Sequence, residues 1–206
     1  ISTSDHITTE EYFFESIRDD IEPKLFRKRK KDVRYSLDSW KDYFYVHTNE
    51  DARDYKILRC KKDNIENLEE FVQPKKETVI GGLDFLDDYI IRAEKSDAIS
   101  KLYVRDINTN NEEEIKISDE PIGVPGASLM QKDTSTSKIR ISWESMATPG
   151  KIFEYDIKTK EKKLVKEVEI PSGHDPNKYV VERIKAKSHD GRMIPISLVR
   201  LKSSKQ

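Results

Sequence analysis

A repeat of short apolar stretches, 45 to 50 residues apart, is the feature of this sequence that most restricts its fold. Tyr12, Ile57, Leu102 and Ile152 each lie in one such stretch, at steps of 45, 45 and 50 residues. Further stretches keep the same register; they contain Phe44, Tyr89 and Ile139, then Phe26, Phe71, Ile115 and Val165, with a weaker leading stretch beginning near Val33, Thr78 and Ser128. Each repeat therefore predicts four short strands.

Four strands in every 45 to 50 residues is the period of a β-propeller blade. The alternative, an all-β sandwich, would show strands without a common register across units. The repeats predict an all-β partial propeller with four-stranded blades over about 30–75, 76–120 and 121–170, and with residues 1–29 supplying the trailing half of another. Such an arc leaves two apolar blade faces uncovered, so either two copies associate or the chain belongs to a larger ring. We favour the larger ring.

The end of the chain departs from the 45–50 residue repeat. Residues 170–177 contain two prolines and a glycine and predict a linker, whereas residues 179–202 alternate apolar and polar side chains around Asp190-Gly191. An Asp-Gly pair between alternating runs is a strong hairpin signal. We therefore expect a propeller domain over 1–170, a linker over 171–178, and the start of a second domain over 179–206.

Composition narrows the classes of function. The 206 residues are 35% hydrophobic and 37% charged, with a formal net charge of −1. A near-neutral balance argues against general binding to nucleic acid or to an anionic membrane. The single cysteine, Cys60, excludes an internal disulfide framework and fits a reducing compartment. No apolar run reaches the roughly 18 residues that a membrane span needs. We expect a cytoplasmic protein with no nucleic-acid or membrane partner.

Two stretches imitate catalytic motifs. Residues 126–130 (Gly-Ala-Ser-Leu-Met) begin like a nucleophile elbow, but Met130 takes the place of the second glycine. We interpret this stretch as the loop that starts a blade. Ser172, His174 and Asp175 are the residue types of a catalytic triad, yet they crowd one proline-flanked segment, whereas triad members converge from separate elements. We predict no catalytic residue in this chain.

The remaining candidates also favour structural roles. The four histidines and Cys60 show no spacing typical of metal ligands, so neither a metal nor a cofactor is expected. The basic run at 27–31 could contact a polyanion, but its place between two blades favours an exposed charge cluster. Gly81-Gly82 predicts a turn with positive φ between two strands of a blade.

Several stretches resemble the prolyl oligopeptidase family, and within it most closely the oligopeptidase B type. They run through nearly the whole chain in the family's order: Tyr35-Ser36-Leu37-Asp38 with Tyr43-Phe44-Tyr45 and Thr48-Asn49, then Ser145-Met146-Ala147-Thr148-Pro149 before Ile152-Phe153-Glu154, then the linker from Gly173 to Tyr179, and finally Asp190-Gly191 before Ile194-Pro195-x-Ser197-Leu198-Val199. The resemblance implies the later blades of a seven-bladed ring, followed by the opening hairpin of an α/β-hydrolase domain.

The resemblance also implies an activity. Members of the family are serine peptidases in which the propeller covers the active site and excludes folded proteins; the oligopeptidase B type cuts short peptides after Lys or Arg. No residue here matches the family's catalytic triad, so the chain by itself is expected to be inactive. Its partners would be short peptides, the remaining blades and the peptidase domain of the same enzyme. Asp190 and Gly191 would be structural, and Pro171, Gly173 and Pro176 would form an interdomain hinge.

A second hypothesis is a stand-alone binding module that holds a partner protein on the loops of one face. A native product that ends at Gln206 and folds cooperatively would favour the binding module. The peptidase would be favoured by a product that associates through open blade faces. It would also be favoured by a gene that continues into a G-x-S-x-G elbow. We prefer the peptidase.

Overall fold

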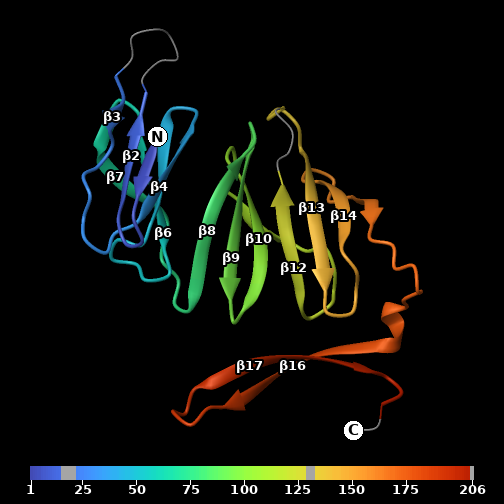
Figure 1. Ribbon diagram of the computed structural model, residues 1–206. Coiled ribbons are helices and arrows are strands. Elements are labelled where there is room, and N and C mark those ends of the chain that lie inside the picture. Colours follow the sequence, from blue (N-terminus) through green and yellow to red (C-terminus); the bar gives the residue numbers. More distant parts are fainter. Residues whose placement is uncertain (15–21, 129–132, 205–206) are drawn as a thin grey trace. The chain divides into compact units, whose positions relative to one another are not determined.

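The computed structural model describes residues 1–14, 22–128 and 133–204 (Figure 1). Within these ranges every regular element is a strand, except for one short 3-10 turn. The chain divides into two compact units, Ile1–Gly82 and Leu83–Gln206. In the part that the structure describes, no helix is long and apolar enough to cross a membrane.

The first unit contains two antiparallel sheets. Strands β1 (Ser2–Ser4), β2 (Thr9–Phe13) and β3 (Lys24–Leu25) form one sheet in that order. Strands β4 (Tyr35–Trp40), β5 (Tyr43–Thr48), β6 (Lys56–Lys61) and β7 (Asn64–Val72) form the other, also in chain order. Aromatic rings pack between these sheets: the Phe44 ring lies 5.0 Å from that of Phe13 and 5.7 Å from that of Phe26. This cluster ties the partial sheet to the complete one.

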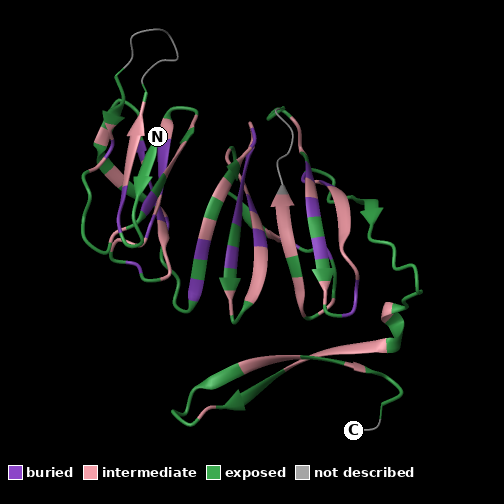
Figure 2. Cartoon of the chain, in the orientation of Figure 1, coloured by how far each residue is buried: buried purple, intermediate pink, exposed green. Residues whose placement is uncertain are grey.

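Two further four-stranded sheets follow. One consists of β8 (Thr78–Phe85), β9 (Tyr89–Ser96), β10 (Ile99–Asp106) and β11 (Glu112–Ile115). The other consists of β12 (Gly123–Ser128), β13 (Lys138–Ser145), β14 (Lys151–Asp156) and β15 (Lys162–Glu167). Alternate residues of both sheets, among them Ile91, Val104, Ile139 and Ile141, share one apolar core. Along β13 the buried residues Ile139, Ile141 and Trp143 alternate with less buried ones, as in a half-buried strand, whereas residues 89–92 of β9 are all buried. Figure 2 colours the strands by this burial.

The last two strands form a sheet of their own. The 3-10 turn η1 (Pro176–Lys178) leads into β16 (Tyr179–Lys187), which pairs only with β17 (Met193–Leu201) among the strands of the described chain. Pro195 lies within β17 opposite Lys185. Because a two-stranded sheet has only edge strands, the missing proline N–H can face away from the ladder.

The fold class predicted from the repeats is confirmed, because three four-stranded antiparallel sheets follow one another at the expected spacing. Three local predictions were wrong. The described part of residues 1–29 contains three strands and not two. The leading strand of the blade predicted over about 121–170 begins at Gly123 rather than near Ser128, so Gly126 and Ser128 lie inside a strand and not in a loop. Met130 lies outside the described residues.

Gly81-Gly82 is the third correction. The pair lies within β8, and neither glycine has a positive φ. The turn that follows β8 comes later, at residues 86–88. Two glycines in a row resemble a turn in sequence, but here both lie in the extended backbone of a strand.

Candidate functional site

The tip of the terminal hairpin is a compact loop that holds Asp190 and Gly191. The Ser188 N–H donates to the Arg192 carbonyl at 2.7 Å, and the Gly191 N–H donates to the Ser188 carbonyl at 2.9 Å. The Asp190 carboxylate accepts the Arg192 N–H at 3.1 Å. Gly191 has a φ of +84°, a conformation that glycine adopts without strain. These contacts are internal to the loop.

The linker contains the three residues predicted to form a hinge. Gly173 has a φ of +78° and donates its N–H to the Ile170 carbonyl at 2.9 Å, which closes a turn around Pro171 and Ser172. Pro176 is the first residue of η1, and the Asp175 side chain caps this turn by accepting the Asn177 N–H. Movement about these residues stays a prediction, as do the domain limits at 170 and 179.

His174 attaches the linker to the β13–β14 turn. Its Nε2 lies 2.6 Å from the Ala147 carbonyl; since a carbonyl only accepts, Nε2 carries the proton. The imidazole also stacks on the Tyr179 ring, with centroids 5.3 Å apart. With His174 bound to a backbone carbonyl and Asp175 capping η1, the Ser172–His174–Asp175 group is structural and does not form a triad.

The hairpin also contacts the β9–β10 turn. The Asp97 carboxylate of that turn lies 3.3 Å from the Lys185 ammonium and 3.8 Å from the Arg183 guanidinium, measured to Oδ2. On the opposite face of the hairpin, Arg200 binds Glu182 at 3.1 Å. Sequence reasoning missed the Asp97 contact. An acidic residue in a two-residue turn is visible in the sequence, but its partners lie far along the chain.

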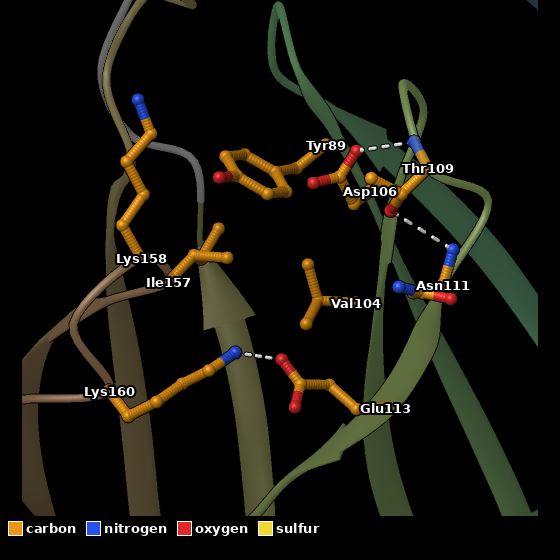
Figure 3. A pocket seen from close by; sticks show the side chains of 9 residues that line it. All are labelled: Tyr89, Val104, Asp106, Thr109, Asn111, Glu113, Ile157, Lys158 and Lys160. Atoms are coloured by element: carbon orange, nitrogen blue, oxygen red, sulfur yellow. Dashed lines mark hydrogen bonds and ion pairs between the residues drawn. The ribbon is translucent and has the colours of Figure 1, made fainter.

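A pocket of about 430 Å³ opens between the β8–β11 and β12–β15 sheets (Figure 3). The Tyr89, Val104 and Ile157 side chains form its apolar part, and Lys160 pairs with Glu113 across it. Hydrogen bonds to Asp106, chiefly from the Thr109 N–H, lower the pKa of its carboxyl group. Burial raises the pKa of the Tyr89 hydroxyl, and nearby carboxylates add to the shift.

The described lining of this pocket consists mostly of charged or polar side chains. At neutral pH Asp106 is ionised and Tyr89 is protonated. The pocket lining contains neither a serine, cysteine nor histidine, the residue types that most often form a nucleophile with its base. In the described ranges, no group of three His, Cys, Asp or Glu side chains is placed to hold a metal ion.

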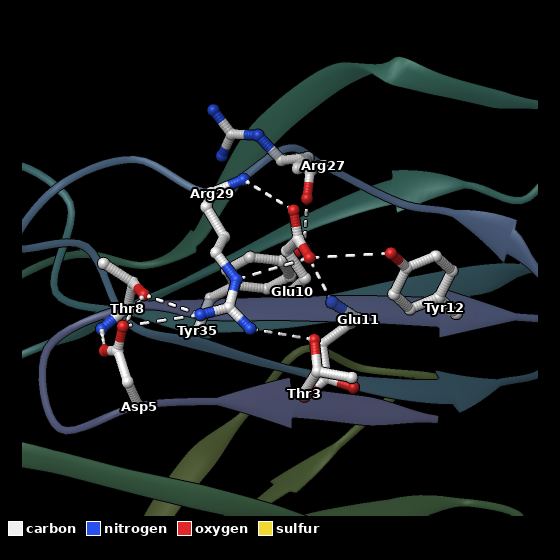
Figure 4. A network of polar contacts seen from close by, with 9 residues as sticks. All are labelled: Thr3, Asp5, Thr8, Glu10, Glu11, Tyr12, Arg27, Arg29 and Tyr35. Atoms are coloured by element: carbon white, nitrogen blue, oxygen red, sulfur yellow. Dashed lines mark hydrogen bonds and ion pairs between the residues drawn. The ribbon is translucent and has the colours of Figure 1, made fainter.

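The basic run at 27–31 forms ion pairs within the first unit. Arg29 reaches Asp5 at 3.4 Å and Glu10 at 3.3 Å (Figure 4). Arg27 and Lys30 both bind Glu50, at 2.9 and 2.8 Å, and the bond from Lys30 is the main cause that lowers the pKa of the Glu50 carboxyl group. Paired cations of this kind support the structural interpretation of the run over a polyanion site.

Repeated four-stranded sheets with these contacts define a segment of a β-propeller. The profile of the family described as "Prolyl oligopeptidase, N-terminal beta-propeller domain" matches residues 1–168. The chain belongs to the prolyl oligopeptidase family, which confirms the resemblance seen in its sequence.

Individual relatives agree with this assignment. The chain is 31% identical to dipeptidyl aminopeptidase BI of Pseudoxanthomonas mexicana over 83% of this chain, and 23% identical to protease 2 of Moraxella lacunata over 88%. It spans about a quarter of those proteins, 24% and 26% of their lengths.

Solved structures show the same fold. Oligopeptidase B of Leishmania major matches 98% of this chain with a TM-score of 0.85 and 21% identity, over 30% of its own length. Oligopeptidase B of Trypanosoma brucei, in a closed form with covalently bound antipain, matches 96% with a TM-score of 0.84 and 22% identity, over 29% of its length.

Proposed function

We propose that this chain is the substrate-gating propeller portion of an oligopeptidase B-like serine endopeptidase that cuts short peptides after Lys or Arg. The observation that carries the proposal is the separate hairpin β16–β17, which follows the propeller sheets through a short linker. The family profile ends at residue 168, whereas the two oligopeptidase B structures match 96% and 98% of the chain. The match to these enzymes therefore extends from the blades into the segment where a peptidase domain would begin.

The propeller would act by size selection. A ring of blades placed over an active site admits a short, extended peptide but excludes a folded protein. The catalytic serine, histidine and aspartate would lie outside residues 1–206, so the chain purified alone should hydrolyse nothing. We extend the proposal to a reducing, cytoplasmic setting, because Cys60 is the single cysteine and is buried; cell fractionation of the whole enzyme tests this.

The activity test uses the whole enzyme and three reporter peptides that differ in the residue before the scissile bond. Arginine or lysine there should give rapid, serine-reagent-sensitive release, and alanine should give little. Residues 1–206 alone should release nothing from any reporter. Hydrolysis by this chain alone would contradict the absence of catalytic residues, whereas a whole enzyme that prefers alanine would contradict the proposed specificity.

A second candidate is the removal of N-terminal dipeptides, because the relative with 31% identity carries the name dipeptidyl aminopeptidase. Reporters with a free and with an acetylated N-terminus distinguish the two. An endopeptidase cleaves both, since it does not need the terminal ammonium group. An enzyme that removes dipeptides cleaves only the free form.

Gating requires that the propeller and the peptidase domain separate. One structural match comes from a study of two prolyl endopeptidases described as concerning the role of inter-domain dynamics. Deleting Gly173 in the whole enzyme should reduce turnover of long peptides more than turnover of dipeptide reporters. Equal reductions for both would count against a hinge at Pro171, Gly173 and Pro176.

A further inference from the structure

We propose that Asp97 is the docking point of the propeller for the terminal hairpin, and that its contact with Arg183 is a half-formed latch that tightens when the domains close. The inference rests on the proposed gating function. It adds a particular pair of groups that favours the closed state.

The first part of the latch is a rigid turn. Asp97 and Ala98 are the two loop residues between β9 and β10, and Ser96 pairs directly with Ile99 across the turn. Their φ values are +49° and +59°, the conformation of a two-residue type I′ hairpin turn. Because this turn has few alternative conformations, the Asp97 carboxylate is presented at a defined position on the edge of the sheet.

The second part is an arginine with unused hydrogen-bonding capacity. The Arg183 side chain is only 13% exposed. Its Nη1 donates to the Ser197 hydroxyl at 3.0 Å, whereas Nε and Nη2 are buried and have no hydrogen-bond partner among the described residues. Buried donors without partners are unfavourable, so Arg183 favours any movement that brings an acceptor to these two nitrogens.

The Asp97 carboxylate is the acceptor that could bind these two nitrogens. Nε and Nη2 lie along one edge of the guanidinium group, the edge that can bind a carboxylate through two parallel bonds. The Asp97 Oδ2 atom now lies 3.8 Å from Nε, beyond hydrogen-bond range. An approach of about 1 Å would bring it to the usual donor–acceptor distance. The geometry is that of a two-bond ion pair that is not yet complete.

Lys185 also binds Asp97 from the hairpin. Its ammonium lies 3.3 Å from the same Asp97 oxygen and is half exposed, so it retains attraction while Arg183 is too distant for a hydrogen bond. The Glu182–Arg200 pair lies on the other face of the hairpin and stays intact whether or not the hairpin is docked. Among the described residues, the ion pairs of Asp97 are the ones found between the hairpin and the β8–β11 sheet.

The linker fits a movement of this kind. His174 is bound to the Ala147 carbonyl at 2.6 Å, which attaches the first half of the linker to the β13–β14 turn. The hairpin is thus connected to the β12–β15 sheet through the linker and to the β8–β11 sheet through Asp97. Opening must break the Asp97 contact, while the His174 contact can persist.

The test measures the open fraction of the whole enzyme by X-ray scattering without substrate. Asp97→Asn should raise the ratio of open to closed enzyme by roughly three- to fivefold, the range expected for a partly exposed ion pair. Asp190→Asn is the matched control, because Asp190 pairs with Arg192 inside the hairpin tip, and it should change nothing. At about 1 M salt, where the screening length is about 3 Å, the unaltered enzyme should approach the Asp97→Asn variant.

A double-mutant cycle identifies the partner. Arg183→Gln should open the enzyme, and Asp97→Asn with Arg183→Gln should open it no further than the stronger single change. Equal behaviour of Asp97→Asn and Asp190→Asn would overturn the latch, and so would additive effects in the double variant. Because scattering needs no substrate, an enzyme that opens as expected but cleaves no basic peptide refutes the proposed function and leaves the latch standing.

Discussion

Arg92 offers the sharpest test of how this propeller segment is stabilised. Arg92 lies in β9 with only 3% of its side chain exposed, and it binds Glu94, which is 5% exposed, through Nη1. Its Nη2 binds Glu112 of β11 at 2.6 Å, and its guanidinium lies 5.2 Å from the centre of the Tyr103 ring. Arg92→Met would remove both ion pairs and leave the Glu94 carboxylate buried without this cation.

The expected cost is about 3–5 kcal/mol, because the change removes the guanidinium of a buried ion pair while the Glu94 carboxylate stays buried. Replacing both partners, as in Arg92→Met with Glu94→Met, should recover at least about 1 kcal/mol of that loss, since an apolar pair of similar volume needs no compensation. Arg105→Met is the matched control. Arg105 binds the same Glu112 at 3.1 Å but is 22% exposed, so its loss should cost no more than about 1 kcal/mol.

Urea denaturation followed by tryptophan fluorescence measures these differences in unfolding free energy. The expected order of stability is the unaltered protein, then Arg105→Met, then the double variant, then Arg92→Met. A cost below about 1 kcal/mol for Arg92→Met, or a double variant no more stable than Arg92→Met, would show that the buried charges do not depend on each other as argued.

Three further predictions test local features. Ala98→Gly should raise the unfolding free energy by about 0.5–1 kcal/mol, because relief of left-handed strain exceeds the entropy that glycine loses; thermal unfolding measures the gain. Burial lowers the pKa of His47 below its usual 6.5. The neutral imidazole therefore contributes stability above pH 6.5, and this contribution is lost as the pH falls through the folded-state pKa. His47→Gln should flatten this pH dependence, measured by denaturation at about pH 5 to 7. Gly123→Ala would place a Cβ 2.4 Å from Trp143 Nε1 and should cost about 1–3 kcal/mol, whereas Gly82→Ala, with nothing within 4 Å, should show no such loss in the same denaturation assay.

Local patterns predicted the strands well and the boundaries less well. The apolar stretches around Phe44, Tyr89 and Ile139, which recur at a fixed spacing, placed β5, β9 and β13, because short apolar runs bounded by turn residues indicate buried strands. The same reasoning misplaced the start of β12, where Gly126 and Pro125 resemble loop residues. They are tolerated there because β12 pairs on one side only, and the free side can accommodate a missing N–H.

The terminal hairpin also has one feature that the sequence predicted and one that it did not. Asp190-Gly191 indicated the turn because only a few residue types adopt positive φ readily. The interaction of Arg183 with Asp97 was not predictable, since nothing in the alternation of β16 distinguishes that arginine from the exposed Arg192. The signal for the linker was equally local, in Pro171, Gly173 and Pro176, but its attachment through His174 was not visible.

The sequence by itself determined the order and spacing of the strands in the three full blades and the family of the chain, because these depend on the spacing of apolar and turn residues over short stretches. Only the tertiary structure decided which charges meet. Arg29 with Glu10, Arg92 with Glu112 and Arg183 with Asp97 are each brought together by sheet pairing or packing between distant segments. Ionic attraction falls steeply with distance in solvent, so an ion pair depends on that arrangement and leaves no periodic trace in the sequence.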